Sequence, residues 1–517
     1  MGEECIAAVP GYISYFHDES RMEGRADYIA FPEDTDQAAA VIRRAVAEGI
    51  RLTIQGARTG VSGGAVPEGG LILSTERMNR PLGFSPGPEN VPLLRVQGGM
   101  SFKDLENFLL QSPSLADSEA GDSSLFREWA RKLRFPPNPT ETTASIGGAF
   151  ACNACGPNSP RWGSVGDHVR GLAWITATGD IWRIERGQYC FDGNGSPLPG
   201  GGRLSCDTAL PASGIRFLHP RPGLDLIDFL AGSEGVAGFA AELSMELCEL
   251  PAAVWGVVFF FRRDEAALDF AESLGRWREQ SPGGEALSTL EYYDQPSLEL
   301  VRTLASQRVA LRQLPPIDSG AEAAIQVELE GNDPDVLESM LAEQLELFLS
   351  AGGREDDTWA AASSAELEKF HLLRHAVPEL INTELDRRRR DMPELRKTAA
   401  DFAIPPRLVR FYRETYRRGM AEAGLQGFVF GHIAEGRLHV NILPKSHEEL
   451  RRSRALLKRW ADLVMKDGGL LSAENGIGRL KRDICRRLPS ARLAQIRSIL
   501  RDLDPRGVFG GFELMGD

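Results

Sequence analysis

The sequence has no apolar run long enough to cross a bilayer. Its longest, residues 252–261, is about half of the roughly 20 residues that a transmembrane helix needs. Residues 1–5 are acidic and lack the pattern of a secretory signal. We therefore expect a cytoplasmic protein without a transmembrane segment; peripheral association with a membrane through a partner stays an open alternative.

Cysteine is scarce, and positive charge is outweighed by negative charge. Seven scattered cysteines in 517 residues exclude a disulfide-stapled fold and suit a reducing compartment. Cys152 and Cys155 form a single C-x-x-C pair, for which a zinc or redox role stays an open alternative. The net charge of −14 argues against a nucleic-acid partner.

What is present is an ordinary globular composition, 42% apolar and 26% charged, in a chain too long for one hydrophobic core. We expect two domains. In the first half, the patterns predict a helix at 38–49 capped at Asp34, strands at 51–54, 71–74 and 93–97, and a hairpin at 171–184. In the second half, strands and helices alternate at 252–261, 264–280, 323–329 and 334–351, which predicts a ferredoxin-like α+β domain. The basic run 386–391 is predicted to be a solvated loop.

A glycine-rich loop connects the first two predicted strands. Glycines let backbone N–H groups turn inward around an anion, and hydroxyl groups add further donors. This loop therefore predicts a phosphate or pyrophosphate site. The residues concerned are Gly56, Gly60, Gly63 and Gly64, with the hydroxyls of Thr59 and Ser62.

Two common phosphate loops are excluded, because a Rossmann turn or a Walker loop opens directly into a helix. Here Pro67, Gly69 and Gly70 block a helix, and no Gly-Lys-Ser/Thr is present. A hairpin loop without a ligand is the remaining alternative. Residues 140–156 are also small and glycine-rich; they could approach a flat ligand closely or simply form a tightly packed turn and helix. Residues 230–239 are a third cluster of small residues, and they lead into a strand.

Two histidines flank a predicted hairpin turn at Glu435-Gly436. Pairing outward from a two-residue turn puts His432 opposite His439, with Asn441 on the same face. Two imidazoles at that distance could hold one divalent metal, act as general bases or form an unrelated structural pair. Glu474, in the glycine-rich segment 468–478, would complete a metal site, although spacing alone does not tie it to the histidines.

Taken in order, these segments resemble the FAD-linked oxidase family with a vanillyl-alcohol-oxidase-type flavin domain. Within it, the chain looks like the branch of the glycolate oxidase flavin subunit, D-lactate dehydrogenase and D-2-hydroxyglutarate dehydrogenase, from about residue 30 onward. The resemblance implies an α+β fold, with a two-subdomain FAD-binding domain at 1–251 (pyrophosphate loop 55–64), a ferredoxin-like substrate or cap domain at 252–455, and a C-terminal segment at 456–517 that folds back on the FAD domain.

The resemblance also implies three FAD-contacting segments. None has a histidine where relatives attach flavin covalently, so non-covalent FAD is expected. The implied cofactor contacts are Gly56, Ala57, Arg58, Thr59, Gly60, Ser62, Gly63, Ser145, Gly147, Gly148, Asn153, Gly156, Gly163, Glu234, Gly235, Gly238 and Asn475.

For the reacting site, the resemblance implies oxidation of a D-2-hydroxy acid, such as D-lactate, glycolate or D-2-hydroxyglutarate, to the 2-oxo acid. A base takes the hydroxyl proton while hydride passes from Cα to the flavin. The implied catalytic residues are His439, Asn475 and Arg374, the substrate contacts Arg374, Lys397 and Asn441, and the ligands of zinc or manganese His432, His439 and Glu474.

The chain departs from the family pattern near this site. Asn475 stands where the family has a histidine, the presumed proton acceptor, and Arg437 adds a positive charge. Lys397 and Asp401 are more widely spaced than usual, and residues 510–513 replace an Asn-Pro-Gly-Lys. Two alternatives stay open: an altered substrate on the same scaffold, such as another alcohol or a phosphate ester, or a catalytically weak flavin-binding subunit of an electron-transfer complex.

No C-x₂-C-x₂-C iron–sulfur run is present. We therefore expect electrons to leave through a separate acceptor, which could be an iron–sulfur subunit, an electron-transfer flavoprotein, a quinone or oxygen. The small-molecule hydroxy acid is the other expected partner.

Overall fold

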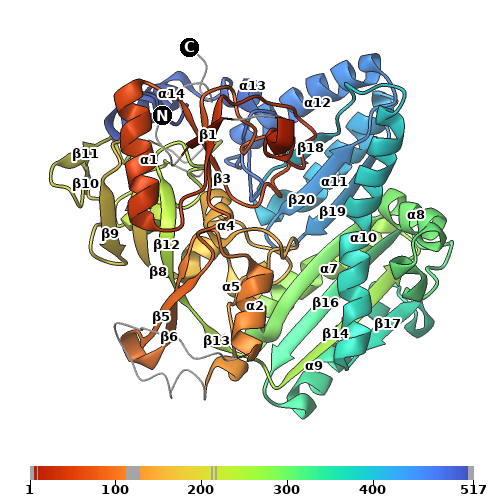
Figure 1. The fold of residues 1–517 in the computed structure, drawn as a ribbon. Coiled ribbons are helices and arrows are strands. Elements are labelled where there is room, and N and C mark those ends of the chain that lie inside the picture. The colour runs from red at the N-terminus through yellow and green to blue at the C-terminus, as the bar shows by residue number, and fades with distance from the viewer. Residues whose placement is uncertain (1–4, 8–9, 112–128, 211–213, 216–217, 511–517) are drawn as a thin grey trace. The chain divides into compact units, whose positions relative to one another are not determined.

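A computed structural model describes residues 5–7, 10–111, 129–210, 214–215 and 218–510. The chain forms two compact units (Figure 1). Unit 1 comprises Met1–Cys155, Ser164–Leu250 and Leu470–Asp517, and unit 2 comprises Gly156–Gly163 and Pro251–Gly469. Compared with the predicted boundaries, the short segment Gly156–Gly163 joins unit 2, and the chain returns to unit 1 at Leu470 rather than at 456.

Unit 1 is built on two main sheets. One has the order β1-β2-β4-β3, in which β4 runs parallel to both β2 and β3, and the other is antiparallel with the order β5-β6-β12-β8-β9. Helix α1 shares one apolar core with both sheets. The elements are β1 Cys5–Ala7, β2 Tyr28–Ala30, α1 Thr35–Glu48, β3 Leu52–Gln55, β4 Leu71–Ser74, β5 Pro81–Pro86, β6 Pro92–Gln97, α2 Phe102–Gln111, β7 Leu133–Arg134, α4 Ile146–Cys152, β8 Val169–Ile175, β9 Ile181–Glu185, β10 Gly195–Pro197, β11 Arg203–Ser205, α6 Leu226–Leu230, β12 Phe239–Glu246, β13 Cys248–Glu249, α13 Arg482–Cys485 and α14 Ser490–Leu503.

Helix α1 shows why local sequence determines these elements. The Asp34 carboxylate accepts a hydrogen bond from the Gln37 N–H at 2.8 Å, which caps the helix start. Gly49 ends the helix in the left-handed conformation, with φ of 66°, where a side chain would be strained. The predicted helix is confirmed, as are the predicted strands around it and the hairpin formed by β8 and β9.

Unit 2 contains a seven-stranded antiparallel sheet with the order β17-β14-β16-β15-β19-β20-β18. Its first part, β14-α7-β15-β16-α9-β17 with α8 inserted between β15 and β16, is a ferredoxin-like βαββαβ unit, as predicted, and β19, β20 and β18 extend it. The elements are α5 Ser159–Trp162, β14 Ala253–Phe261, α7 Asp264–Gln280, β15 Leu287–Asp294, α8 Gln295–Leu304, β16 Ala323–Gly331, α9 Pro334–Ser350, β17 Thr358–Ala361, α10 Ser364–Arg389, β18 Thr398–Asp401, α11 Val409–Glu422, β19 Gly427–His432, β20 Arg437–Ile442 and α12 His447–Lys466.

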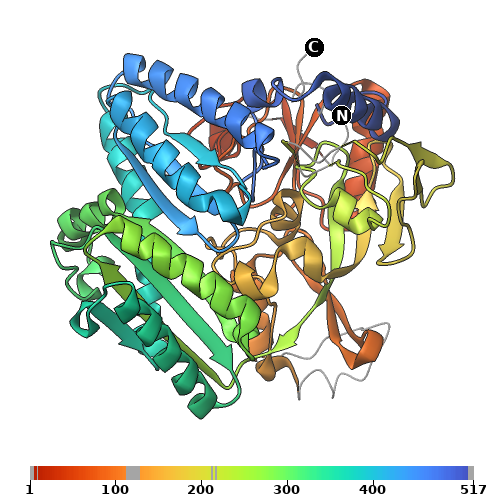
Figure 2. The same ribbon diagram turned by 180° about the vertical axis from the view of Figure 1, so that it is seen from behind.

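The two faces of this sheet are covered by different helices. Alternate residues of β14 point to opposite sides: Phe259 packs against Phe270 of α7 and Phe348 of α9, whereas Phe260 belongs to the core shared with α8 and α10. Helix α10 lies over the sheet in Figure 1, and α7 and α9 lie over it in the reverse view of Figure 2. The face under α10 carries the candidate site residues described below.

Two predictions about unit 2 are wrong. Residues 386–389 are not a loop but the last turn of α10, where Arg388 pairs with Glu384 one turn earlier and donates to the Leu443 carbonyl. In the β19–β20 hairpin, residues 433–436 form a four-residue turn, so that His432 pairs with Arg437 and His439 pairs with Phe430. The histidines are not directly opposed. Because the shift is by two residues, they still share a face.

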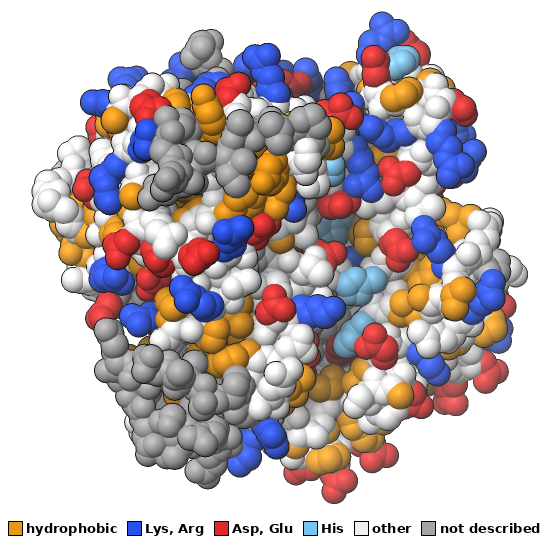
Figure 3. All heavy atoms as spheres, in the orientation of Figure 1, with side chains coloured by type: hydrophobic (Ala, Val, Ile, Leu, Met, Phe, Trp, Pro, Cys, Tyr) orange, Lys and Arg blue, Asp and Glu red, His pale blue; other side chains and the backbone are white. Residues whose placement is uncertain are grey.

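Within the described residues, none of the helices combines the length and apolarity that crossing a membrane requires. Acidic and basic side chains are interspersed over most of the face shown in Figure 3.

Candidate functional site

In unit 1, the three predicted FAD segments adjoin one another. Ser145, the N-cap of α4, packs against Gly56 so closely that a Cβ at Gly56 would clash with the Ser145 hydroxyl. The third segment lies against the second, since Gly232 and Glu234 donate backbone hydrogen bonds to the Phe150 and Ala151 carbonyls at 2.9 and 2.8 Å. The sequence-predicted segments therefore come together around the end of β3.

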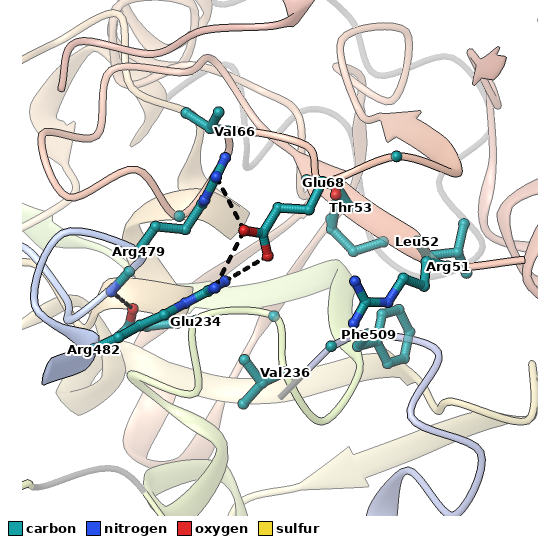
Figure 4. Close-up of a pocket in the computed structure, with 16 residues that line it drawn as sticks. Arg51, Leu52, Thr53, Val66, Glu68, Glu234, Val236, Arg479, Arg482 and Phe509 are labelled. Atoms are coloured by element: carbon teal, nitrogen blue, oxygen red, sulfur yellow. Dashed lines mark hydrogen bonds and ion pairs between the residues drawn. The ribbon is translucent and has the colours of Figure 1, made fainter. Parts of the chain in front are cut away.

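A pocket opens beside the glycine loop (Figure 4). Its lining combines Thr53 and Gly64 near the loop with Glu234 and Gly235 of the third segment and with residues of the C-terminal part of unit 1. A Cβ at Gly60 or Gly64 would meet no atom within 4 Å, so the backbone there borders open space. By contrast, a Cβ at Gly147 would press on the Gly98 and Ala240 carbonyls, so that glycine is required by packing. The loop thus fits an approaching phosphate group.

Positive charge dominates this pocket. Arg479 and Arg482 bind Glu68, with N–O distances of 3.0 and 2.8 Å, and Arg51 also lines the pocket. Burial would raise the pKa of the Glu68 carboxyl, but Arg482, Arg479 and Arg51 together hold it below its usual value. Three guanidinium groups therefore face two carboxylates, Glu68 and Glu234, an excess of positive charge that suits an anionic group.

Glu234 joins the third segment to the C-terminal part of the chain. Its two carboxylate oxygens accept hydrogen bonds from the backbone N–H groups of Ile477 and Gly478, at 2.7 and 2.8 Å. The Leu480 N–H donates to the Ser62 carbonyl at 3.0 Å. Residues 477–480 thus fold back onto both the glycine loop and the third segment.

Other predicted cofactor contacts serve the local structure. The Arg58 guanidinium stacks 4.3 Å from the centre of the Tyr15 ring. Asn153 ends α4 in the left-handed conformation, and its side-chain carbonyl accepts from the Gly166 N–H at 2.9 Å. Gly156 and Gly163 lie in the short segment that belongs to unit 2.

In unit 2, strand pairing arranges the candidate residues in two rows on the face under α10. The first row runs from Glu291 of β15 through His432 of β19 to Arg437 of β20. The second row contains His439 of β20 and, beside it on β18, Asp401. The two imidazole ring centres are 5.3 Å apart. Asn441 lies two residues beyond His439 on the same face.

A buried carboxylate, that of Glu291, contacts the Nδ1 side of His432. Glu291 is fully buried, with one oxygen against His432 Nδ1 in a short contact and the other 2.6 Å from Arg374 Nε. Burial would raise the pKa of Glu291, but the attraction of His432 and Arg374 outweighs it and keeps the pKa below its usual value. The Arg374 guanidinium also lies 5.5 Å from the centre of the Phe430 ring.

His439 also has a carboxylate on its Nδ1 side. Asp401 Oδ1 lies 3.6 Å from that nitrogen, an electrostatic contact rather than a hydrogen bond. Histidines that bind metals through Nε2 commonly have their Nδ1 directed at a carboxylate or carbonyl. Two imidazoles on one face, each with a carboxylate on its Nδ1 side, are a donor set that fits a divalent metal.

The remaining predicted residues are divided between the units. In unit 2, Lys397 Nζ donates to Asn382 Oδ1 of α10 at 2.9 Å. In unit 1, Glu474 Oε2 accepts from the Cys155 thiol, with S and O 2.8 Å apart, and Asn475 follows it. Unit 2 by itself therefore supplies two of the three predicted metal ligands, and unit 1 supplies Glu474.

Sequence reasoning missed Glu291 altogether, and it did not foresee the contacts that Cys155 and Glu435 make. Glu291 and Cys155 touch His432 and Glu474, respectively, across 141 and 319 residues of sequence. Glu435, in the hairpin turn, accepts from Ser159 Oγ at 3.3 Å, and burial raises its pKa against the opposing effects of His432 and Arg437. Only the register of β15 against β19 could have revealed Glu291, and no local pattern encodes that register.

Comparison with known proteins adds an independent line of evidence. Residues 26–185 match a family described as FAD binding domain, and residues 257–511 match one described as FAD linked oxidases, C-terminal domain. A D-lactate dehydrogenase of Anaerostipes hadrus is 24% identical over 476 residues, which cover 91% of this chain and 85% of the relative. A D-2-hydroxyglutarate dehydrogenase of Xanthomonas citri pv. viticola is 26% identical over 490 residues, which cover 92% of this chain and 86% of the relative.

Among solved structures, an alkyldihydroxyacetonephosphate synthase aligns with a TM-score of 0.64 over 98% of this chain and 82% of that one. At 15% identity, this likeness shows the fold alone.

Proposed function

The chain belongs to the FAD-linked oxidase family, and on that premise we propose that it oxidises a D-2-hydroxy acid to the 2-oxo acid and passes the electrons to a separate acceptor. The family assignment makes it an FAD-dependent oxidoreductase. One observation carries the finer proposal: a pair of imidazoles and a buried arginine gather around Glu291 on one sheet face of the oxidase domain. This is the chemistry that a hydroxyl and a carboxylate on adjacent carbons require.

FAD, bound non-covalently, would supply the hydride acceptor. The glycine loop would hold its pyrophosphate through backbone N–H groups, and the Glu234 carboxylate would keep residues 477–478 closed against the third segment. The pocket beside the loop supports this proposal, since its arginines favour an anionic group.

The substrate contacts are assigned by chemistry. Arg374 suits a carboxylate because a guanidinium binds its two oxygens in parallel. Lys397 and Asn441 are further proposed contacts. His432, His439 and Glu474 would hold zinc or manganese, which would polarise the substrate hydroxyl and make its proton easier to remove.

The proton acceptor is the least typical part of the site. Asn475 cannot accept a proton at neutral pH. An imidazole that ligates a metal has no lone pair left for a proton, so His439, with Asp401 Oδ1 3.6 Å from its Nδ1, is the proposed base only where it does not hold the metal. The same residue supports a second candidate function. Because Asn475 replaces the presumed proton acceptor, the protein could serve as a flavin-binding subunit with little turnover of its own.

Turnover with an artificial electron acceptor tests the proposal. The purified protein is supplied with D- or L-lactate, glycolate or D-2-hydroxyglutarate, and both dye reduction and 2-oxo acid formation are measured. We expect stoichiometric formation of both with at least one D-acid. FAD-loaded protein that turns over none of them would contradict the proposed reaction and favour the subunit function.

A further inference from the structure

We propose that Glu291 is a positioning residue that sets both the tautomer of His432 and the orientation of Arg374. The inference deepens the proposed function, because it concerns residues that this function uses. It rests on one buried carboxylate whose two oxygens face two different site residues, His432 on β19 and Arg374 on α10.

Strand pairing holds Glu291 in place. It lies directly across from His432 in the β15–β19 ladder and from Gln326 in the β15–β16 ladder, so it occupies a central strand of the sheet. No part of it is exposed. A carboxylate in such a position persists only where its oxygens are matched by donors or cations, and here those partners are His432 and Arg374.

The contact with His432 determines which ring nitrogen carries the proton. A carboxylate only accepts hydrogen bonds, so a neutral His432 facing Glu291 through Nδ1 carries its hydrogen on Nδ1. Its Nε2 then keeps the lone pair with which an imidazole ligates a metal or accepts a proton. Glu291 thus selects the tautomer that the proposed site needs.

The contact with Arg374 determines the orientation of the guanidinium. Glu291 engages Arg374 Nε at 2.6 Å, and the Phe430 ring flanks the guanidinium at 5.5 Å. With Nε held in this ion pair, the Nη groups form the edge through which Arg374 would bind a substrate carboxylate. A single side chain therefore couples the two halves of the proposed binding site.

An amide cannot replace this carboxylate. In Glu291→Gln, one end of the side chain accepts and the other donates, so only one of the His432 Nδ1–H and the Arg374 guanidinium faces an acceptor oxygen, and the ion pair with Arg374 is lost. If the amide oxygen faces Arg374, its NH₂ faces His432 and favours the tautomer protonated at Nε2. Glu291→Asp retains both acceptor oxygens and is the conservative control.

A second control lies on the neighbouring strand. Glu328 of β16 is also buried, and its side chain accepts from Gln326 and lies 3.6 Å from His371. Glu328→Gln therefore removes a buried charge from the same sheet and leaves the contacts of Glu291 with His432 and Arg374 in place.

Nitrogen NMR of histidine-labelled protein tests the tautomer, with the His432 signals assigned from their loss in His432→Asn. We expect Nδ1–H in the parent, Glu291→Asp and Glu328→Gln, and a shift toward Nε2–H in Glu291→Gln. Zinc affinity, measured by chelator competition, should fall about 10- to 100-fold in Glu291→Gln only, the range found when such supporting partners of metal-binding histidines are removed.

The proposal is overturned if Glu291→Gln leaves the His432 tautomer unchanged, or if Glu328→Gln alters it equally. Failure of the proposed function has a separate readout, because then no 2-hydroxy acid is oxidised in the turnover assay. The tautomer measurement does not depend on turnover and still decides the role of Glu291. Because the substitutions lie in unit 2, denaturant unfolding monitored by circular dichroism shows whether each variant is folded. If Glu291→Gln does not fold, Glu291→Asp decides the question, because the proposal requires it to retain the parent tautomer and zinc affinity.

Discussion

His432 and His439 lie on one face of the β19–β20 hairpin with ring centres 5.3 Å apart, offset by two residues rather than directly opposed. We predict that His432→Ala and His439→Ala each remove bound zinc or manganese, lowering affinity by more than about 100-fold, the upper end of the effect of losing a supporting partner. Metal content of the purified proteins measures this. The exposed His447 on α12 provides the control His447→Ala. Unchanged metal content and rate in both hairpin variants would exclude this metal site.

Asn475 stands where the family resemblance expects a proton acceptor. We predict that Asn475→His increases the rate of flavin reduction by a D-2-hydroxy acid, because a positioned general base typically contributes about 10²- to 10⁴-fold. The rate is measured by anaerobic rapid mixing, with Asn475→Gln as the control that cannot accept a proton. No gain over the parent would show that the base is not missing.

Glu234 holds residues 477 and 478 through two hydrogen bonds from backbone N–H groups. Hydrogen bonds to a charged acceptor contribute about 1.5–3 kcal/mol each, so Glu234→Ala should lower the free energy of unfolding by about 3–6 kcal/mol and weaken FAD retention. Denaturant unfolding and FAD release on dilution measure the two effects. The exposed Glu249 of β13 supplies the control Glu249→Ala. Equal behaviour of the two variants would contradict the role of Glu234.

Asp294 predicts a pH dependence of stability. It caps α8 through Ser297 and also accepts from the Val429 N–H at 2.8 Å, and burial raises its pKa to about 6. Because the folded-state pKa is raised, its contribution to stability is complete below the unfolded pKa, about 4, and is lost as the pH rises through about 6. The loss is on the order of 3 kcal/mol, at about 1.4 kcal/mol per pKa unit.

Asp294→Asn cannot ionise, so the difference in unfolding free energy between parent and variant should decrease as the pH rises from 4.5 to 7.5. Denaturant titrations at a series of pH values measure it. Parallel pH profiles for the two proteins would show that Asp294 does not titrate in this range.

Local chemistry predicted much of the fold. Asp34 and Gly49 mark the ends of α1 because capping depends on neighbouring residues, and the second-half strands and helices follow from their hydrophobic periods. The prediction of a loop at residues 386–391 was wrong for a local reason. Arginine is a good helix former and its positive charge is favourable at a helix C-terminus, so residues up to Arg389 extend α10.

The two histidines of the candidate site could be predicted from the sequence, but the carboxylate that contacts His432 could not. A register shift of two residues leaves every side chain on the same face of a strand. His432 and His439 therefore share a face although the turn has four residues rather than two. Glu291 contacts His432 across 141 residues, and only the order of strands in the sheet brings them together. Long-range strand order is a property of the whole sheet, which no local pattern encodes.

The central claim is most directly tested by the visible spectrum of the purified protein, recorded anaerobically before and after adding D- and L-2-hydroxy acids. We predict a yellow protein whose flavin absorbance is bleached by at least one D-acid and not by its L-enantiomer. A yellow protein that none of these acids bleaches would contradict the proposed reaction while leaving the FAD-binding fold intact.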